Sequence, residues 1–217
     1  MLAQILSGQM SPEGVVALLV ALILGISVHE FSHALAATWL GDTLPRRQGR
    51  LTLAPTAHLD VMGSLMFLIG GFGWGKPVQY NPYALRAGPR SGPALVALAG
   101  PISNIILATI FAVPTRILIL TASGSFSAPG LIILVSLLDG IVYYNLILGF
   151  FNLIPVFPLD GFSILLGILP PELAYQYERT RPWGILILLA LLFFGGSLLG
   201  PVLYEPVALL HHVLTGL

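Results

Sequence analysis

The chain has 217 residues, of which 56% are hydrophobic and only 8% are charged, whereas a soluble domain carries about 25% charged residues. Nine basic residues balance nine acidic ones, so the zero net charge gives no indication of nucleic-acid binding, and the absence of cysteine excludes disulfides, thiolate metal sites and cysteine nucleophiles. The mean hydropathy of +0.93 and the recurring apolar runs predict an integral membrane protein.

The first predicted element is an apolar helix from about Glu13 to Leu40, which begins after Ser11-Pro12 and ends at Gly41-Asp42. It is long enough to cross a bilayer with some tilt. The residues before it, MLAQILSGQMSPEG, lack the basic region and the cleavage site of a secretory signal, so no removed leader is expected.

Three shorter segments follow. In QGRLTLAPTAHLD (48–60), polar and apolar residues alternate over Arg50–Ala54, which favours a short strand or hairpin. The glycine-rich apolar piece VMGSLMFLIGGFG (61–73) is too short to span and indicates a re-entrant or partly buried segment. Residues 73–92 contain many Gly and Pro breakers and predict a loop.

Two further spanning helices are predicted from about Pro93 to Leu120 and from Leu131 to Asn152, joined by an uncharged turn at 121–130. Proline and glycine then interrupt the apolar segment 153–170. The last hydrophobic stretch runs from Trp183 to about Leu199, and the end from Pro201 reads as either a further helix or a surface amphipathic piece.

The expected fold is therefore an all-α polytopic membrane protein with about four spanning helices, re-entrant segments and a short β-hairpin. We expect a single domain over 1–217, because no polar stretch is long enough for a second one. Its core covers about 13–170, and residues 183–217 form a C-terminal helical region.

Basic residues concentrate in two regions, one between the first and second spanning helices and one between the third helix and the last stretch. Because basic loops face the cytoplasm, both regions are expected there, and the first helix then ends on the cytoplasmic side. These residues are Arg46, Arg47, Arg50, Lys76, Arg86, Arg90, Arg179 and Arg181.

The sequence HEFSH, residues 29–33, is an H-E-x-x-H motif inside the first helix. Its spacing puts the imidazoles of His29 and His33 on one helix face, where they can bind one metal ion, with Glu30 beside it to accept a proton from a metal-bound water. Such a short match is often accidental in a soluble chain. Within a membrane helix, however, a glutamate and two histidines are costly unless they are paired, protonated or metal-bound, so a metal site is favoured.

A zinc catalytic site uses three protein ligands and leaves a fourth position for water. Asp160 is the leading candidate for the third ligand, because the prolines and glycine around it prevent a regular helix and allow its carboxylate to point inward. Asp139 is the reserve candidate; the alternative for it is a polar residue paired with Asn145 or a tyrosine within a helix.

HEFSH followed far downstream by NLIPVFPLDG resembles the site-2 protease family of intramembrane zinc metalloproteases, which pairs H-E-x-x-H with N-x-x-P-x-x-x-L-D-G. GRLTLAPTAHLDVMGSL, FGWGKPVQYNP and ALAGPISN resemble its compact bacterial and archaeal branch, without PDZ or CBS domains. The resemblance covers about residues 25–165. Phe162 stands where many members have a second small residue, and a side chain there is expected to narrow the site.

The resemblance implies that Zn²⁺ is bound by His29, His33 and Asp160, with Glu30 as general base. It further implies that Asn152 steadies the substrate carbonyl or its oxyanion, for which an amide donor near the metal is physically suited. A cap at the C-terminal end of a helix is the alternative role for Asn152.

In the family, a sheet and a membrane-dipping loop lie near the cleft, and an unwound substrate could add as a strand to an exposed edge. Arg50, Leu51, Thr52 and Leu53 are therefore candidate substrate contacts. His58 is another, against the alternative of a loop histidine hydrogen-bonded to Asp60. Two features are expected to be structural or interfacial: the pair His211 and His212, and the G-P-x-x-N element Gly100, Pro101 and Asn104.

The predicted function is a zinc endopeptidase that hydrolyses peptide bonds in or near transmembrane segments of membrane proteins, as a multi-pass protein of a prokaryotic cell membrane with its active site toward the cytoplasm. Its partners are a transmembrane substrate and the lipid bilayer. The sequence leaves the oligomeric state open. The alternatives are a membrane metal-ion transporter and a catalytically inactive homologue that binds membrane partners.

Overall fold

The computed structural model describes residues 12–70, 73–121 and 129–217. Four of the described helical segments are long and apolar enough to cross a membrane: Gly14–Trp39, Gly88–Thr121, Gly130–Asn152 and Gly196–Thr215. The chain is thus a multi-pass, all-α membrane protein, as expected from its composition. Residues 122–128 of the expected uncharged turn and residues 71–72 of the short apolar piece lie outside the described part.

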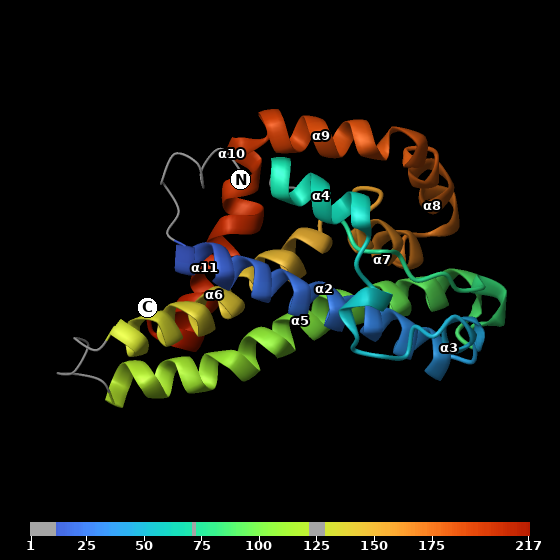
Figure 1. The fold of residues 1–217 in the computed structure, drawn as a ribbon. Helices are drawn as coiled ribbons and strands as arrows, with labels where there is room; N and C mark the ends of the chain where they lie inside the picture. The colour runs from blue at the N-terminus through green and yellow to red at the C-terminus, as the bar shows by residue number, and fades with distance from the viewer. Residues whose placement is uncertain (1–11, 71–72, 122–128) are drawn as a thin grey trace.

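Three long helices make the centre of the molecule: α2 (Pro12–Trp39), α5 (Gly88–Thr121) and α6 (Pro129–Asn152). They pack against one another more extensively than any other elements do, and Figure 1 shows them running alongside one another. Small buried residues such as Ala34, Ala108 and Gly100 line the contacts. Small side chains let helix backbones approach closely. Close packing of this kind stabilises helix association in a membrane, where the hydrophobic effect contributes little to it.

Helix α5 continues through Pro93, Pro101 and Pro114. The prolines therefore do not end the helix, since neighbouring helices and local adjustments compensate for the lost backbone hydrogen bonds in membrane proteins. Gly100, in the first half of the helix, lies against α2, and the far half packs with α6 and with the C-terminal helix.

The segment between α2 and α5 contains only short elements. These are α3 (Leu44–Arg47), the 3₁₀ turn η1 (Pro55–Ala57), α4 (Val61–Gly70) and the 3₁₀ turn η2 (Pro82–Ala84). Helix α4 has 10 residues and is too short to span. That it re-enters the membrane stays a prediction.

The expected β-hairpin is wrong for the described residues. They contain no strand, and the pairing there is a single antiparallel bridge between Leu59 and Gly75. Side chains occupy the carbonyls that a ladder would need: His58 bonds the carbonyl of Thr52, and Arg50 bonds those of Ala57 and Lys76. The alternating pattern thus reflects a loop held by its own buried polar side chains.

After α6 the protein contains a series of short helical elements, the last three of which join into one longer helical run. They are α7 (Asp160–Ile168), α8 (Pro171–Glu178), η3 (Arg181–Trp183), α9 (Gly184–Phe194), α10 (Gly196–Leu199), η4 (Gly200–Tyr204) and α11 (Glu205–Thr215). Helix α7 packs against α5, and α11 packs against α5 and α6.

The fourth helix of spanning length is not the one expected. The predicted stretch Trp183–Leu199 is broken at Gly195, so α9 has only 11 residues, about 16 Å. Residues 196–215 instead form one continuous helical run through a π turn. His211 on α11 donates to Asp139 on α6 at 2.7 Å, which links the two helices.

Candidate metal centre

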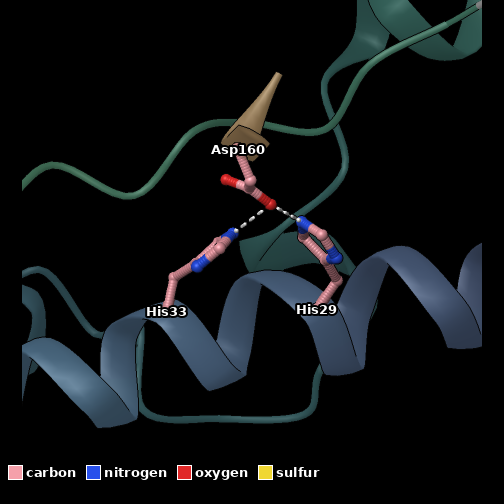
Figure 2. A group of neighbouring side chains, drawn as sticks. All are labelled: His29, His33 and Asp160. Carbon is pink, nitrogen blue, oxygen red and sulfur yellow. Dashed lines mark ion pairs between the residues drawn. The ribbon is translucent and has the colours of Figure 1, made fainter. Parts of the chain in front are cut away.

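His29 and His33 lie one turn apart on α2, and both side chains leave the helix on the same side (Figure 2). Both are buried, with exposed fractions of 6% and 7%. Their ring centroids are 4.6 Å apart and the rings are nearly perpendicular. Each therefore presents a ring edge to the same small volume, as the spacing predicts.

Asp160 is the first residue of α7 and faces the two histidines across that volume (Figure 2). Its Oδ2 atom lies 3.0 Å from Nε2 of His29 and 3.3 Å from Nε2 of His33. Zinc bonds of about 2.0–2.2 Å at tetrahedral angles place neighbouring ligand atoms about 3.3–3.5 Å apart. The three side chains form a group that could hold a metal ion, with all three ligand atoms within 4.8 Å of one another.

The loop before α7 aims Asp160 at this volume. A Cβ atom on Gly161 would lie only 2.2 Å from the carbonyl oxygen of Leu153, so the loop 153–159 folds tightly over the start of the helix. Only glycine permits that approach. The carboxylate is thereby presented from the first residue of α7, directly after the non-helical loop that the prolines predict.

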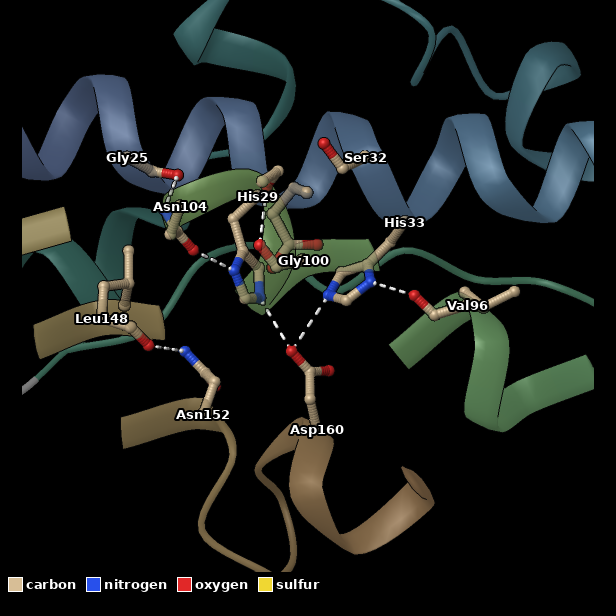
Figure 3. A network of polar contacts seen from close by, with 12 residues as sticks. Gly25, His29, Ser32, His33, Val96, Gly100, Asn104, Leu148, Asn152 and Asp160 are labelled. Atoms are coloured by element: carbon tan, nitrogen blue, oxygen red, sulfur yellow. Dashed lines mark hydrogen bonds and ion pairs between the residues drawn. The ribbon is translucent and has the colours of Figure 1, made fainter. Parts of the chain in front are cut away.

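The other ring nitrogens of both histidines face fixed acceptors (Figure 3). Nδ1 of His33 lies 2.7 Å from the carbonyl of Val96, and Nδ1 of His29 lies 2.6 Å from Oδ1 of Asn104. The amide nitrogen of Asn104 donates to the carbonyl of Gly25 at 3.1 Å, which sets the orientation of that amide. Both Nδ1 atoms are therefore donors.

This assignment determines what the Nε2 atoms present. A neutral imidazole that donates from Nδ1 carries a lone pair on Nε2. Two such lone pairs then face Oδ2 of Asp160, which is buried and has no hydrogen-bond partner among the described residues. Three electron-rich atoms converging at these distances fit a divalent cation, and ligating histidines usually donate their second nitrogen in this way.

Helix α5 lies directly against the histidine pair at Gly100. A Cβ atom there would lie 2.5 Å from Cε1 of His33 and 2.6 Å from Nε2 of His29. The two imidazoles thus occupy the space that any side chain at position 100 would need. A purely structural role was expected for this glycine; its place against the ligand atoms makes it part of the site.

A buried amide pair supports His29 from behind. Asn104 on α5 also donates to Oδ1 of Asn145 on α6 at 3.0 Å, and Asn145 donates to the carbonyl of Ile141 at 2.8 Å. Both asparagines are completely buried. Sequence reasoning did not assign them to the site, although asparagines inside two spanning helices are a signal that could have found them.

Glu30 lies beside the group and faces Arg50 from the loop after α3. Arg50 is only 4% exposed, and its Nη2 atom is 3.6 Å from Oε2 of Glu30. That Oε2 atom is buried and has no hydrogen-bond partner among the described residues. Burial lowers the pKa of Arg50, and the negative charge of Glu30 acts in the opposite direction.

His58 is fully buried, and its Nε2 atom lies 2.6 Å from the carbonyl of Thr52. The alternative partner considered for it, Asp60, instead accepts from the backbone N–H of Gly63 at 2.8 Å. His58 thus fastens the loop 52–58 and is not in the metal-binding group.

Two other candidates are bonded to groups other than the three ligands. Asp139 is bonded to His211 and does not belong to the metal-binding group. Asn152 ends α6, where its amide donates to the carbonyl of Leu148 at 2.9 Å (Figure 3). In this conformation the Asn152 amide bonds its own helix.

Among the other expected substrate contacts, Leu53 is 57% exposed, while Leu51 and Thr52 are partly buried. Leu53 and Pro55 line an open apolar pocket of about 270 Å³ together with Val20, Ile23, Leu24 and Ser27 of α2. The α2 residues in this lining recur at helical spacing on one face of the helix. At 100° per residue that face points away from His29 and His33, so the pocket lies on a different side of α2 from the metal centre.

Phe162 is buried and packs beneath the start of α7. It stacks on Tyr177 at a centroid distance of 4.6 Å, and the Arg181 guanidinium lies 4.9 Å from its ring. The hydroxyl of Tyr177 donates to the carbonyl of Pro155 at 2.6 Å, and burial raises the pKa of Tyr177 to about 12. Phe162 was expected to narrow the site; it supports the turn that carries Asp160.

Tyr80, which sequence reasoning did not single out, lies near the same centre. Burial raises the pKa of Tyr80, and the charge of Asp160 adds to the effect. Its ring packs against the cluster of Ala37, Leu85 and Val96, and Val96 supplies the carbonyl that His33 bonds.

Curated proteins similar to this chain are named as zinc metalloproteases. "Putative zinc metalloprotease YwhC" of Bacillus subtilis is 35% identical over 192 residues, covering 86% of this chain and 85% of the relative. "Putative zinc metalloprotease Rip2" of Mycolicibacterium smegmatis is 30% identical over 176 residues, or 78% of this chain and 64% of the relative. "Zinc metalloprotease MJ0392" of Methanocaldococcus jannaschii is 29% identical over 109 residues, or 49% of this chain and 29% of the relative. No protein-family model and no solved structure matches the chain.

Proposed function

Because the chain belongs to the site-2 protease family of zinc metalloproteases, we propose that it is an intramembrane endopeptidase that cuts peptide bonds in or near transmembrane segments. The observation that carries the proposal is the convergence of His29, His33 and Asp160, two of them on a helix of spanning length. A protease whose ligands lie on such a helix works at the depth of the bilayer, where its substrates are membrane-embedded chains.

In this proposal the Nε2 atoms of His29 and His33 and the carboxylate of Asp160 hold the zinc ion. Zinc bound there supplies a Lewis acid that polarises the scissile carbonyl and makes water a stronger nucleophile near neutral pH. The carbonyl of Val96 and the amide of Asn104 keep both imidazoles in the tautomer that leaves Nε2 free.

Glu30 is the proposed general base. Its buried Oε2 atom has no hydrogen-bond partner among the described residues, so a lone pair there is open to accept a proton from the attacking water. The same carboxyl group then delivers that proton to the leaving amine. The helix places Glu30 next to His29, about 100° round α2 from it, which is beside the ligands.

Asn152 is proposed to donate to the substrate carbonyl as negative charge develops on it. To do so, its amide exchanges its bond to the Leu148 carbonyl for one to the substrate. The exchange costs little because Leu148 belongs to the preceding turn of the same helix, whose backbone already uses that carbonyl.

We propose that substrate lies along Leu51, Thr52 and Leu53, of which Leu53 is exposed and able to contact an apolar side chain of the substrate. A peptide bond within a helix is shielded, so the bound segment is extended at the point of cleavage.

The protein in liposomes, with a panel of transmembrane substrates, tests the mechanism. Glu30→Gln is expected to keep zinc and to lower kcat by about 10²- to 10⁴-fold, because a base of the same size is replaced by an amide. Asp160→Ala is expected to lose zinc and activity together. Glu172→Gln, on the exposed start of α8, is the control for removing one carboxylate.

If Glu30→Gln cleaved substrate at the rate of the parent protein, the role of Glu30 as general base would be rejected. A parent that binds zinc and cuts no substrate in the panel would favour the inactive homologue. The transporter alternative requires zinc uptake into sealed liposomes. Among the described residues, one group of three possible ligands converges on a single point, whereas an ion pathway needs several such groups along the membrane, which favours the protease.

A further inference from the structure

Arg50 lies in a loop and is nevertheless almost completely buried beside the proposed base. The side chain of Arg50 is 5% exposed and that of Glu30 is 13% exposed, and their nearest charged atoms are 3.6 Å apart. The Arg50 guanidinium is too buried to bind substrate at the surface, and it makes no close salt bridge with Glu30. Its burial at this position therefore needs another explanation.

The remaining contacts of Arg50 are with backbone carbonyls. Nη1 donates to the carbonyl of Ala57 at 2.6 Å, and Nη2 donates to the carbonyl of Lys76. One side chain thus joins the loop 50–57, the segment at 75–76 and, through Glu30, helix α2. The planar guanidinium can hold several acceptors in fixed directions at once, which a lysine ammonium cannot do in the same geometry.

The segment at Gly75 lies directly over the Glu30 carboxylate. A Cβ atom on Gly75 would be 3.3 Å from Oε1 of Glu30, 3.1 Å from the carbonyl of His58 and 2.8 Å from Cγ2 of Ile26. The backbone N–H of Lys76 donates to that His58 carbonyl at 2.6 Å. One oxygen of Glu30 is therefore covered by backbone, and the other faces Arg50.

We infer that Arg50 is a positioning residue that orients Glu30 for proton transfer without occupying the lone pair that the reaction uses. Its two carbonyl acceptors hold the guanidinium 3.6 Å from Oε2, close enough to attract the carboxylate and too far for a hydrogen bond. A close bidentate pair would instead engage both oxygens. The inference rests on the proposed function of Glu30 as base, and it differs from the substrate contact that the sequence suggested for Arg50.

The test uses the full chain in liposomes and measures zinc content, thermal stability, kcat and KM. Arg50→Gln is expected to lower kcat by about 100-fold, the cost of a catalytic group misplaced by about 1 Å, with zinc content and KM unchanged. Arg50→Lys keeps the charge and is expected to recover part of the lost kcat. Arg47→Gln, an exposed arginine on α3, is the matched control and should leave all four measurements unchanged.

A second variant disturbs the same arrangement without removing a charge. Gly75→Ala should shift the segment that carries the Lys76 carbonyl and crowd Oε1 of Glu30, and a fall in kcat with zinc retained is expected if the position of Glu30 matters. If Arg50→Gln does not fold, Arg50→Lys decides the role of Arg50.

Three results would overturn the inference. They are a folded, zinc-loaded Arg50 variant with parental kcat, a loss confined to KM, and a loss of zinc in proportion to activity. Parental cleavage by Glu30→Gln would reject the base itself. An inactive Glu30→Gln together with a fully active Arg50→Gln would reject only the role of Arg50.

Discussion

The two histidines of the metal centre are held by different kinds of partner. His33 bonds a backbone carbonyl, that of Val96, which no substitution removes. His29 bonds the side-chain amide of Asn104, which is itself held by Gly25 and Asn145. The support of His29 is therefore the part of the site that mutation can remove without touching a ligand.

Asn104→Ala is expected to weaken zinc binding by about 10- to 100-fold, because partners that orient a ligating histidine contribute to affinity on this scale. Competition with a chelator of known affinity measures the change. Thr109→Ala, which removes an exposed polar side chain from the same helix, is the control. An unchanged zinc affinity in Asn104→Ala would mean that His29 needs no side-chain partner.

Much of this centre could be predicted at the residue level, and the limits have a physical cause. HEFSH identifies two ligands because helical spacing alone puts His29 and His33 together. Asp160 required the resemblance to a known family as well. Asn104 lies 75 residues from His29, and their contact depends on how α5 packs on α2, which local pattern does not determine.

Among the elements, α5 is the one that shapes the metal centre most directly. It supplies Val96, Gly100 and Asn104 at successive turns of one face, and these residues contact the two imidazoles. The closeness of α5 to α2 at this level is therefore a requirement of the site as well as a feature of membrane helix packing.

Gly100→Ala is expected to expel zinc, because the added methyl group would lie within 2.6 Å of ring atoms in both histidines. Zinc content after purification, with the helical circular-dichroism signal as a measure of folding, tests this. Gly130→Ala is the matched control, since a Cβ atom there meets nothing within 4 Å. Full zinc occupancy in folded Gly100→Ala would show that α5 can move away from α2 at little cost.

Element prediction succeeded for the helices and failed where side chains replace backbone partners. Helices α2, α5 and α6 were expected within a few residues of their bounds, because long apolar runs determine them. The alternation around Leu51 and Leu53 indicated a strand, but His58 and Arg50 take the carbonyls that a strand would use. The last span was misplaced because Gly195 ends α9, which hydropathy alone does not show.

At the scale of the whole molecule, the distribution of charge bears on how the protein sits in its membrane. The segment between α2 and α5 carries exposed arginines such as Arg46 and Arg47, whereas residues 121–130 between α5 and α6 carry no charge. We propose that the first segment, and with it the metal centre, faces the cytoplasm of a prokaryotic cell.

The natural absence of cysteine allows a direct test of this orientation. A membrane-impermeant maleimide added to intact cells is expected to label Thr121→Cys and not Arg47→Cys. Thr121 is the last residue of α5, whereas Arg47 lies on α3 in the segment before α5, so the spanning helix α5 separates the two positions. Permeabilised cells should label both. The reverse pattern in intact cells would place the basic segment outside.

The metal centre also joins two parts of the molecule that are far apart in sequence, because α2 supplies two ligands and α7 the third. An ion bound only by the folded protein stabilises it, by about 1.4 kcal/mol for each tenfold rise in free zinc above Kd. The midpoint of thermal unfolding is therefore expected to rise with free zinc in the parent and to fall on chelation. Glu30→Gln should show the same dependence, since Glu30 is not a proposed ligand, whereas Asp160→Ala should lose it. A dependence that persists in Asp160→Ala would mean that α7 is not held to α2 through the metal.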